Sequence, residues 1–192
     1  YSAYSLWKQN KEGYRKRYYL NEAPIDPPQT RFGKEQHALK ELDETVEGSE
    51  TRIECVIDGL TLMGYVDSLD ANLKVIDFKF SHLSKTGKEP WDAVKVRKHE
   101  QFPFYCLIVR ESHGIYNPEC ELHWHETKFK EKVVTVYEGK SYVFDDKSME
   151  TTGRVEKFVR TVEPWELDRL KVEILQVALE ISNDYTEWTK NN

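Results

Sequence analysis

The chain has 192 residues and a formal net charge of −6 at pH 7, with 32% charged and 12% aromatic residues. This composition is typical of a soluble globular protein and argues against a disordered chain, because it offers enough apolar surface for a core. No apolar run reaches the length of a membrane span. The acidic balance argues against a generic nucleic-acid coating protein, which would be basic. It is compatible with a site whose clustered carboxylates are neutralised by bound metal ions.

The three cysteines, Cys55, Cys106 and Cys120, are scattered and odd in number, so they predict no disulfide framework. We interpret Cys55 and Cys106 as buried free thiols, which favours a reducing, cytoplasmic compartment. The length suits one domain over residues 1–192. No signal peptide is visible. The chain begins at Tyr1 rather than at a methionine, so we expect a trimmed fragment of a longer protein.

The first predicted element is a helix from Ser2 to Leu20, in which basic residues alternate with aromatic ones. Such a surface could hold a phosphate backbone and stack on bases, or it could belong to a surface helix that buries its aromatic face. A Pro-rich loop follows, then a second helix over about Thr30–Leu42 that contains His37. The acidic stretch Asp43–Glu50 is predicted to be a linker into a sheet.

Strands are predicted next, over Thr51–Ile57, Leu60–Ser68 and Leu73–Phe80. A polar loop over residues 81–90, which we expect to be mobile, leads to a helix over Trp91–Arg110. Pro103 should kink or break this helix. Further strands are expected over Glu119–Lys128, Val133–Tyr137 and Ser141–Phe144. A long helix beginning near Pro164 completes a mixed α/β domain, with core positions at Leu167, Leu170, Ile174, Leu175, Val177 and Leu179.

Cys120, His123 and His125 have a spacing that could indicate zinc, but no second cluster completes four ligands. We therefore interpret them as part of a strand with a solvated or stacked pair of histidines.

The most informative feature is the run from Gly64 to Lys79, in which a turn at Asp70–Asn72 joins two apolar segments, so a β-hairpin is predicted. On a strand, residues i and i+2 share a face, so Asp77 and Lys79 point the same way, roughly 7 Å apart along the chain. Asp67 on the partner strand can reach the same place. Two carboxylates beside one ammonium suit a hard divalent cation and a phosphodiester. Alone, the pattern would equally describe a solvated edge strand.

Several separated motifs together resemble the RecB-like branch of the PD-(D/E)XK nuclease superfamily. The matching segments are the basic-aromatic run Tyr14–Tyr19, Gly33-x-x-x-His37, Gly64-x-x-Asp67, Asp77-x-Lys79 and Gln101-x-x-x-Tyr105. They occur in the family's order and span nearly the whole chain. The literal Pro before the first Asp is replaced by Val66. The four cysteines that hold an iron–sulfur cluster in some relatives are absent, so no cluster is expected.

The resemblance implies a restriction-endonuclease-like core, with a central mixed β-sheet flanked by helices. It also implies Mg²⁺ or Mn²⁺ bound by Asp67, Asp77, the Phe78 carbonyl and His37. Lys79 would orient the attacking water or stabilise developing charge, and Gln101 and Tyr105 would position the phosphate or Lys79. Residues that could grip the strand without reading bases are Lys8, Arg15, Arg17, Lys85 and Lys88.

The function favoured by this resemblance is a metal-dependent DNA exonuclease used in recombination or repair. A catalytically idle DNA-binding or scaffold domain of the same fold is a second possibility, and an endonuclease a third. No helicase-type phosphate loop is present, so a recombination or helicase partner would be a separate chain. The sequence leaves polarity, strand preference and oligomeric state open.

Overall fold

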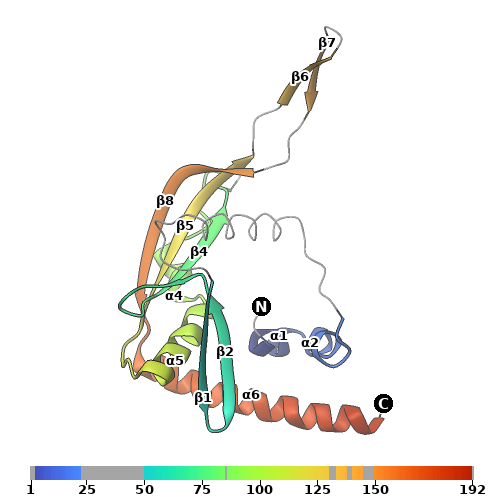
Figure 1. Ribbon diagram of the computed structural model, residues 1–192, viewed down its shortest axis with the longest axis vertical. Coiled ribbons are helices and arrows are strands. Elements are labelled where there is room, and N and C mark those ends of the chain that lie inside the picture. The colour runs from blue at the N-terminus through green and yellow to red at the C-terminus, as the bar shows by residue number, and fades with distance from the viewer. Residues whose placement is uncertain are drawn as a thin grey trace.

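The computed structural model describes residues 3–22, 50–84, 86–129, 133–137, 140–144 and 149–191 (Figure 1). The helices are α1 (Ala3–Gln9), α2 (Lys11–Tyr18), α4 (Ala93–Arg97), α5 (Gln101–His113) and α6 (Pro164–Asn191). The strands are β1 (Thr51–Ile57), β2 (Leu60–Val66), β3 (Ser68–Leu69), β4 (Val75–Ser81), β5 (Glu119–Phe129), β6 (Val133–Tyr137), β7 (Lys140–Phe144) and β8 (Met149–Thr161). The helix predicted over residues 30–42, most of the predicted linker and His37 lie outside the described residues.

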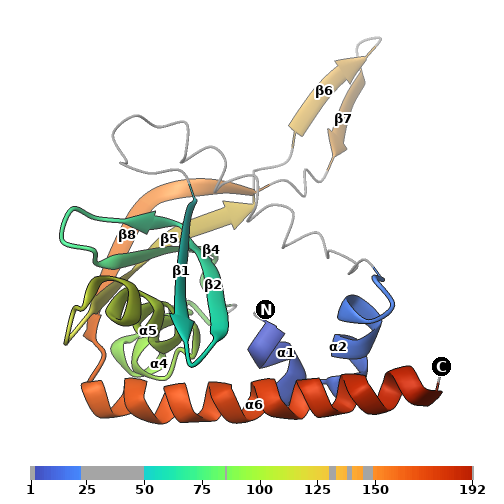
Figure 2. The ribbon, with the colours of Figure 1, turned by 60° about the horizontal axis from the view of Figure 1, so that its bottom comes forward.

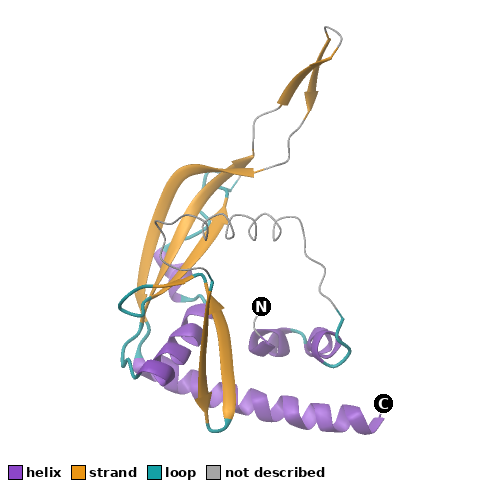
Figure 3. Cartoon of the chain, viewed as in Figure 1, coloured by secondary structure: helices purple, strands orange, loops and turns teal. Residues whose placement is uncertain are grey.

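The central sheet has four strands in the order β3-β4-β5-β8. Figure 3 draws the strands of the fold in orange and its helices in purple. β4 and β5 are parallel, whereas β3 pairs with β4 and β8 pairs with β5 in the antiparallel sense. Parallel neighbours need a long crossover, and α4 and α5 lie in the segment that connects β4 to β5. The sheet is therefore mixed and carries helices, as the predicted α/β class requires.

The core lies between this sheet and α5, which is buried along most of its length. Leu122 and Trp124 of β5 and Phe102 and Leu107 of α5 are fully buried in one apolar cluster. The long helix α6 runs past α5 toward α1 and α2 (Figure 2). Because α6 contacts both α1 and α5, it joins the N-terminal helices to the rest of the fold.

β1 and β2 form a separate antiparallel hairpin that packs its apolar face on α5. The residues of the turn are Asp58 and Gly59, with φ values of 49° and 82°. Two positive φ values are the signature of the tight turn that Asp-Gly favours in hairpins. The open end of the hairpin, where β1 begins and β2 ends, lies at the candidate site, with Asp67 directly after β2.

The first predicted helix is in fact two helices, α1 and α2. Asn10 separates them, and its side-chain oxygen accepts a hydrogen bond from the Gly13 backbone N–H at 2.8 Å. Asn is one of the preferred N-cap residues because it satisfies an otherwise unpaired N–H of the first turn. The prediction of one continuous helix was wrong because it overlooked this cap.

The helix predicted over residues 91–110 is also divided, but not at Pro103. The break between α4 and α5 covers Lys98–Glu100, and Pro103 is the third residue of α5. The first four N–H groups of a helix have no intrahelical acceptor, so a proline there removes no hydrogen bond. Pro103 therefore marks the start of a helix rather than its interruption.

Two further corrections concern the C-terminal part. The prediction omitted β8, the long strand that forms an edge of the central sheet. The long helix begins at Pro164 as predicted, and Leu167, Ile174 and Val177 are buried. Leu179, expected in the core, is 63% exposed. The hairpin of β6 and β7 is confirmed, with β7 beginning one residue early.

Cys55, Cys106 and Cys120 are all buried free thiols, as predicted for the first two. In the part of the chain that is described, no helix has both the length and the apolar character needed to cross a membrane.

Candidate active site

Strand β4 places Asp77 and Lys79 on the face of the sheet that carries α5. Their parallel partners on β5 are the buried Leu122 and Trp124. Asp77 is only 4% exposed. The predicted common face of the two side chains is thus confirmed, and one carboxylate lies almost out of contact with bulk water.

Asp67 lies between β2 and β3, and not within the partner strand of β4 as predicted. The expected strand over Leu60–Ser68 is divided there, and of residues 60–69 only Ser68 and Leu69 pair with β4. Asp67 Oδ2 accepts a hydrogen bond of 2.7 Å from the backbone N–H of Phe78, eleven residues later. The N–H and C=O of one strand residue point to the same edge of the strand, so the Phe78 carbonyl points to the edge of β4 that Asp67 approaches. This contact therefore places the Asp67 carboxylate against β4 at the residue that follows Asp77.

Lys79 is held by its neighbours on the same face. Its Nζ lies 3.0 Å and 2.9 Å from the two carboxylate oxygens of Asp77, and 3.5 Å from Oε1 of Gln101 on α5. The lysine side chain is 28% exposed, against 6% for that of Asp77. The ammonium is thus located between a buried carboxylate and solvent.

Gln101 and Tyr105 lie one turn apart on α5, where Gln101 Nε2 donates to the Tyr105 hydroxyl at 2.7 Å. Burial, and then the carboxylates of Asp77, Asp67 and Glu50, raise the pKa of Tyr105 to about 12, although the Gln101 hydrogen bond lowers it. Tyr105 therefore keeps its proton at neutral pH and can act as a hydrogen-bond donor.

Gly64 of β2 is required by the position of the Tyr105 ring. A Cβ at residue 64 would lie 2.8 Å from Tyr105 Cε1 and 3.1 Å from Cδ1. These separations are too short for carbon atoms in contact, so the ring occupies the space that a side chain would need. The structure gives a steric reason for the glycine in the G-x-x-D motif.

The donor set fits a hard divalent cation. Asp67 and Asp77 offer carboxylates and Phe78 a carbonyl, and such oxygen ligands suit Mg²⁺, which keeps several waters when protein ligands are few. Among the residues that are described, no group of three or more His, Cys, Asp or Glu side chains is arranged for a metal ion. His37, the fourth expected donor, lies outside them.

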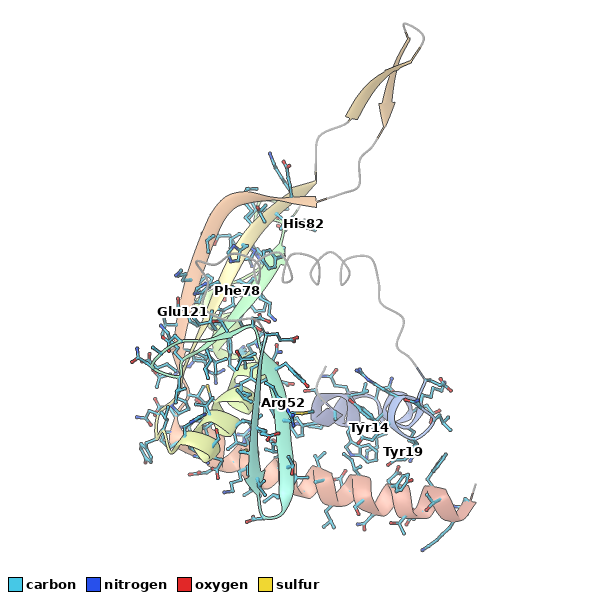
Figure 4. The ribbon with its side chains drawn as sticks, viewed as in Figure 1. Tyr14, Tyr19, Arg52, Phe78, His82 and Glu121 are labelled. Carbon is cyan, nitrogen blue, oxygen red and sulfur yellow. The ribbon has the colours of Figure 1, made fainter. Side chains whose placement is uncertain are left out.

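The basic residues predicted to grip DNA have varied surroundings. Lys8 pairs with Glu173, and Arg15 pairs with Asp184, both on α6. Tyr14 and Tyr19 lie on the same side of α2, facing α6 (Figure 4). Lys8 and Arg15 therefore have carboxylate partners that fasten the N-terminal helices to α6.

The remaining three predicted DNA contacts are Arg17, Lys88 and Lys85. The Arg17 guanidinium lies 5.5 Å from the ring centroid of Tyr18. Lys88 is exposed and closes a turn through its backbone N–H, which donates to Ser84 Oγ at 2.9 Å. Lys85 lies outside the described residues.

The histidines of β5 pair with Phe78 and Phe80 of β4, so they lie on the face of the sheet opposite Asp77 and Lys79. His125 is buried and stacks on Phe80 with ring centroids 4.9 Å apart, and His123 bonds Glu121 at 2.7 Å. The stacked interpretation is confirmed, and the solvated one is wrong for His125.

Sequence reasoning missed Glu50, whose carboxylate helps to raise the Tyr105 pKa. Thr51 pairs with Val66, so the next positions outward are Glu50 and Asp67. The Asp58-Gly59 turn sets this register, so counting outward from the turn could have revealed the pair.

A family model described as the PD-(D/E)XK nuclease superfamily matches residues 3–191. Among solved structures, a crystal structure of a candidate exonuclease from Eubacterium rectale aligns at 14% identity with a TM-score of 0.35. That alignment covers 94% of this chain and 62% of the other, so the chain spans less than two thirds of that protein. No curated protein sequence matches the chain significantly.

Proposed function

The chain belongs to the PD-(D/E)XK nuclease superfamily, and from this premise we propose that it is a Mg²⁺- or Mn²⁺-dependent deoxyribonuclease, acting as an exonuclease in recombination or repair. The observation that supports this most strongly is the hydrogen bond from the Phe78 N–H to Asp67 Oδ2, beside the Asp77–Lys79 ion pair. It gathers residues of two separate motifs, Gly64-x-x-Asp67 and Asp77-x-Lys79, into one site.

Asp67, Asp77, the Phe78 carbonyl and His37 would hold the metal ion. When bound, the ion acidifies a water molecule and neutralises oxygens of the scissile phosphate. Asp67 is oriented by the backbone of β4, so its carboxylate does not have to be ordered when DNA arrives. Such preorganisation lowers the cost of assembling the reacting groups.

Lys79 supplies the mobile positive charge. In the absence of substrate its ammonium neutralises Asp77. When that carboxylate binds a cation, the ammonium can turn toward the phosphate and orient the attacking water or stabilise the developing charge. Its partial exposure gives it access to a bound strand.

Gln101 and Tyr105 would complete the phosphate site from α5. Since Gln101 Nε2 donates to the Tyr105 oxygen, the phenolic proton of Tyr105 is available for a phosphate oxygen. The Oε1 of Gln101 faces the Lys79 ammonium, so the pair can link the position of the lysine to that of the phosphate.

For strand binding we propose Arg17, Lys85 and Lys88 as phosphate contacts. The ion pairs of Lys8 and Arg15 favour a primarily structural role for those two, in place of the contact with DNA expected from sequence. We further propose that residues 1–192 act as one nuclease domain in the cytoplasm, with any helicase or recombination partner on a separate chain.

The decisive experiment uses end-labelled single- and double-stranded linear DNA and covalently closed circles. Each is incubated with Mg²⁺, Mn²⁺ or EDTA, for the unmodified protein and for Lys79→Ala. Lys190→Ala, which removes an exposed lysine from the end of α6, is the matched control. We expect linear DNA, but not closed circles, to be degraded in a metal-dependent way. Of the two substitutions, only Lys79→Ala should abolish this activity.

Two other outcomes have clear meanings. Cutting of closed circles would assign endonuclease activity instead. DNA binding without cleavage in either metal would assign the catalytically idle domain and refute the proposed reaction.

A further inference from the structure

His99 lies in the break between α4 and α5, two residues before Gln101. Its ring packs between Trp91 and Phe102, with centroid separations of 5.3 Å and 5.0 Å. Its Nδ1 is buried and has no hydrogen-bond partner among the described residues. Leaving a buried polar atom unsatisfied costs free energy, so a group of this kind calls for an explanation.

Two cations, Lys79 and Arg160, act on the imidazole. Burial, followed by these two charges, lowers the pKa of His99 to about 4. At neutral pH the ring is therefore uncharged and carries one proton. In the tautomer with that proton on Nε2, Nδ1 is a hydrogen-bond acceptor.

Of the two cations, only the Lys79 ammonium changes its surroundings in the proposed reaction. The Arg160 guanidinium donates to the carbonyls of Val96 and His99, at 3.4 Å and 3.3 Å, and to Glu166 at 2.5 Å. Lys79 is held mainly by Asp77, since its separation from Gln101 is long at 3.5 Å. A metal ion on Asp77 would weaken the one strong contact that the ammonium makes within the described part of the chain.

We propose that His99 is a positioning residue for Lys79, and that its Nδ1 accepts a hydrogen bond from the Lys79 ammonium once Asp77 is committed to a metal ion. This inference rests on the proposed function. An uncharged acceptor suits the task, because it directs the ammonium without competing with the negative phosphate for its charge. Contacts with Trp91 and Phe102 restrict the rotation of the ring.

Three substitutions separate the role of Nδ1 from the packing of the ring. His99→Phe keeps an aromatic ring but removes the acceptor, His99→Asn places an amide oxygen near the position of Nδ1, and His99→Gln places one near Nε2. We expect kcat to fall about tenfold in His99→Phe and His99→Gln with KM little changed, and to recover in His99→Asn. Melting temperatures identify any variant that fails to fold.

A second measurement does not depend on cleavage. The rate at which an amine-reactive reagent modifies Lys79 is followed by mass spectrometry, with and without Mg²⁺ and no DNA, and Lys190 is the internal reference. With Mg²⁺ present, Lys79 should react faster in His99→Phe than in the unmodified protein, and His99→Asn should restore the slower rate.

Equal Lys79 reactivity in all forms, or a rescue by His99→Gln as good as that by His99→Asn, would overturn the assignment of Nδ1. If the unmodified protein bound DNA but cleaved none, the proposed function would fail on its own. The lysine reactivity would still decide whether His99 contacts Lys79.

Discussion

Replacing Gly64 with alanine tests whether the close approach of β2 to α5 sets the geometry of the site. The added methyl would lie 2.8 Å from Tyr105 Cε1, where ordinary van der Waals contact begins at 3.4 Å. The ring or strand must therefore move by roughly 0.6 Å, and displacements near 1 Å in a site can cost about a hundredfold in rate. We expect kcat to fall by about ten- to a hundredfold.

The effect on stability should be smaller than the effect on rate. Overpacking a core costs about 1–3 kcal/mol, and replacing glycine within a strand returns roughly 0.5–1 kcal/mol. A net loss of about 1 kcal/mol in the free energy of unfolding is expected from these two effects. It is measured by denaturant unfolding alongside steady-state cleavage of linear DNA.

Tyr105→Ala provides the matched background, because it removes the atoms with which the new methyl collides. Gly64→Ala should cost little further stability in that background, so the two substitutions should be strongly non-additive. A Gly64→Ala protein with the rate and stability of the unmodified protein would refute the steric reasoning. So would an equal stability loss in both backgrounds, since the collision with Tyr105 would then not be the cause.

Three further predictions concern Asp67, Arg15 and His99. Asp67→Asn should keep the fold, because the amide oxygen can still accept a hydrogen bond from the Phe78 N–H. Its kcat should fall at least about a hundredfold, because a charged metal ligand is lost. A fully active Asn variant in the cleavage assay would exclude Asp67 as a ligand. Arg15→Ala should lower the melting temperature by a few degrees, because the ion pair with Asp184 on α6 is lost. Its affinity for DNA in a gel-shift titration should stay within about twofold of that of the unmodified protein. A large loss of affinity would instead show that Arg15 contacts DNA. The pKa of His99 is about 4 in the folded protein, below its ordinary value of 6.5. Between pH 6.5 and pH 4 the unfolded chain therefore binds a proton at His99 that the folded protein does not bind, so this residue lowers the stability of the fold as the pH falls through that range. His99→Phe should melt with a shallower pH dependence over this window, and an unchanged dependence would show that His99 is not buried as a neutral group.

The local parts of the fold follow directly from the sequence. The pattern of residues 51–57 predicts β1 with the bounds that the structure has, and the i, i+2 spacing places Asp77 and Lys79 on one face. Both are effects of near neighbours in the chain, so the strand period suffices to predict them. The order of the motifs likewise indicated the family without any knowledge of the packing.

Only the tertiary structure decided which separated residues meet. Gly64 is needed because of a ring 41 positions later in the chain, and the acceptor for the Phe78 N–H is the side chain of Asp67, from the segment between β2 and β3. Arg15 resembles a DNA contact in sequence but meets a carboxylate 169 residues away. Neither hydrophobic periodicity nor residue type predicts such contacts, because these contacts depend on how helices and strands pack after they form. The sequence thus determined the chemistry available to this protein, and packing decided which groups can act together.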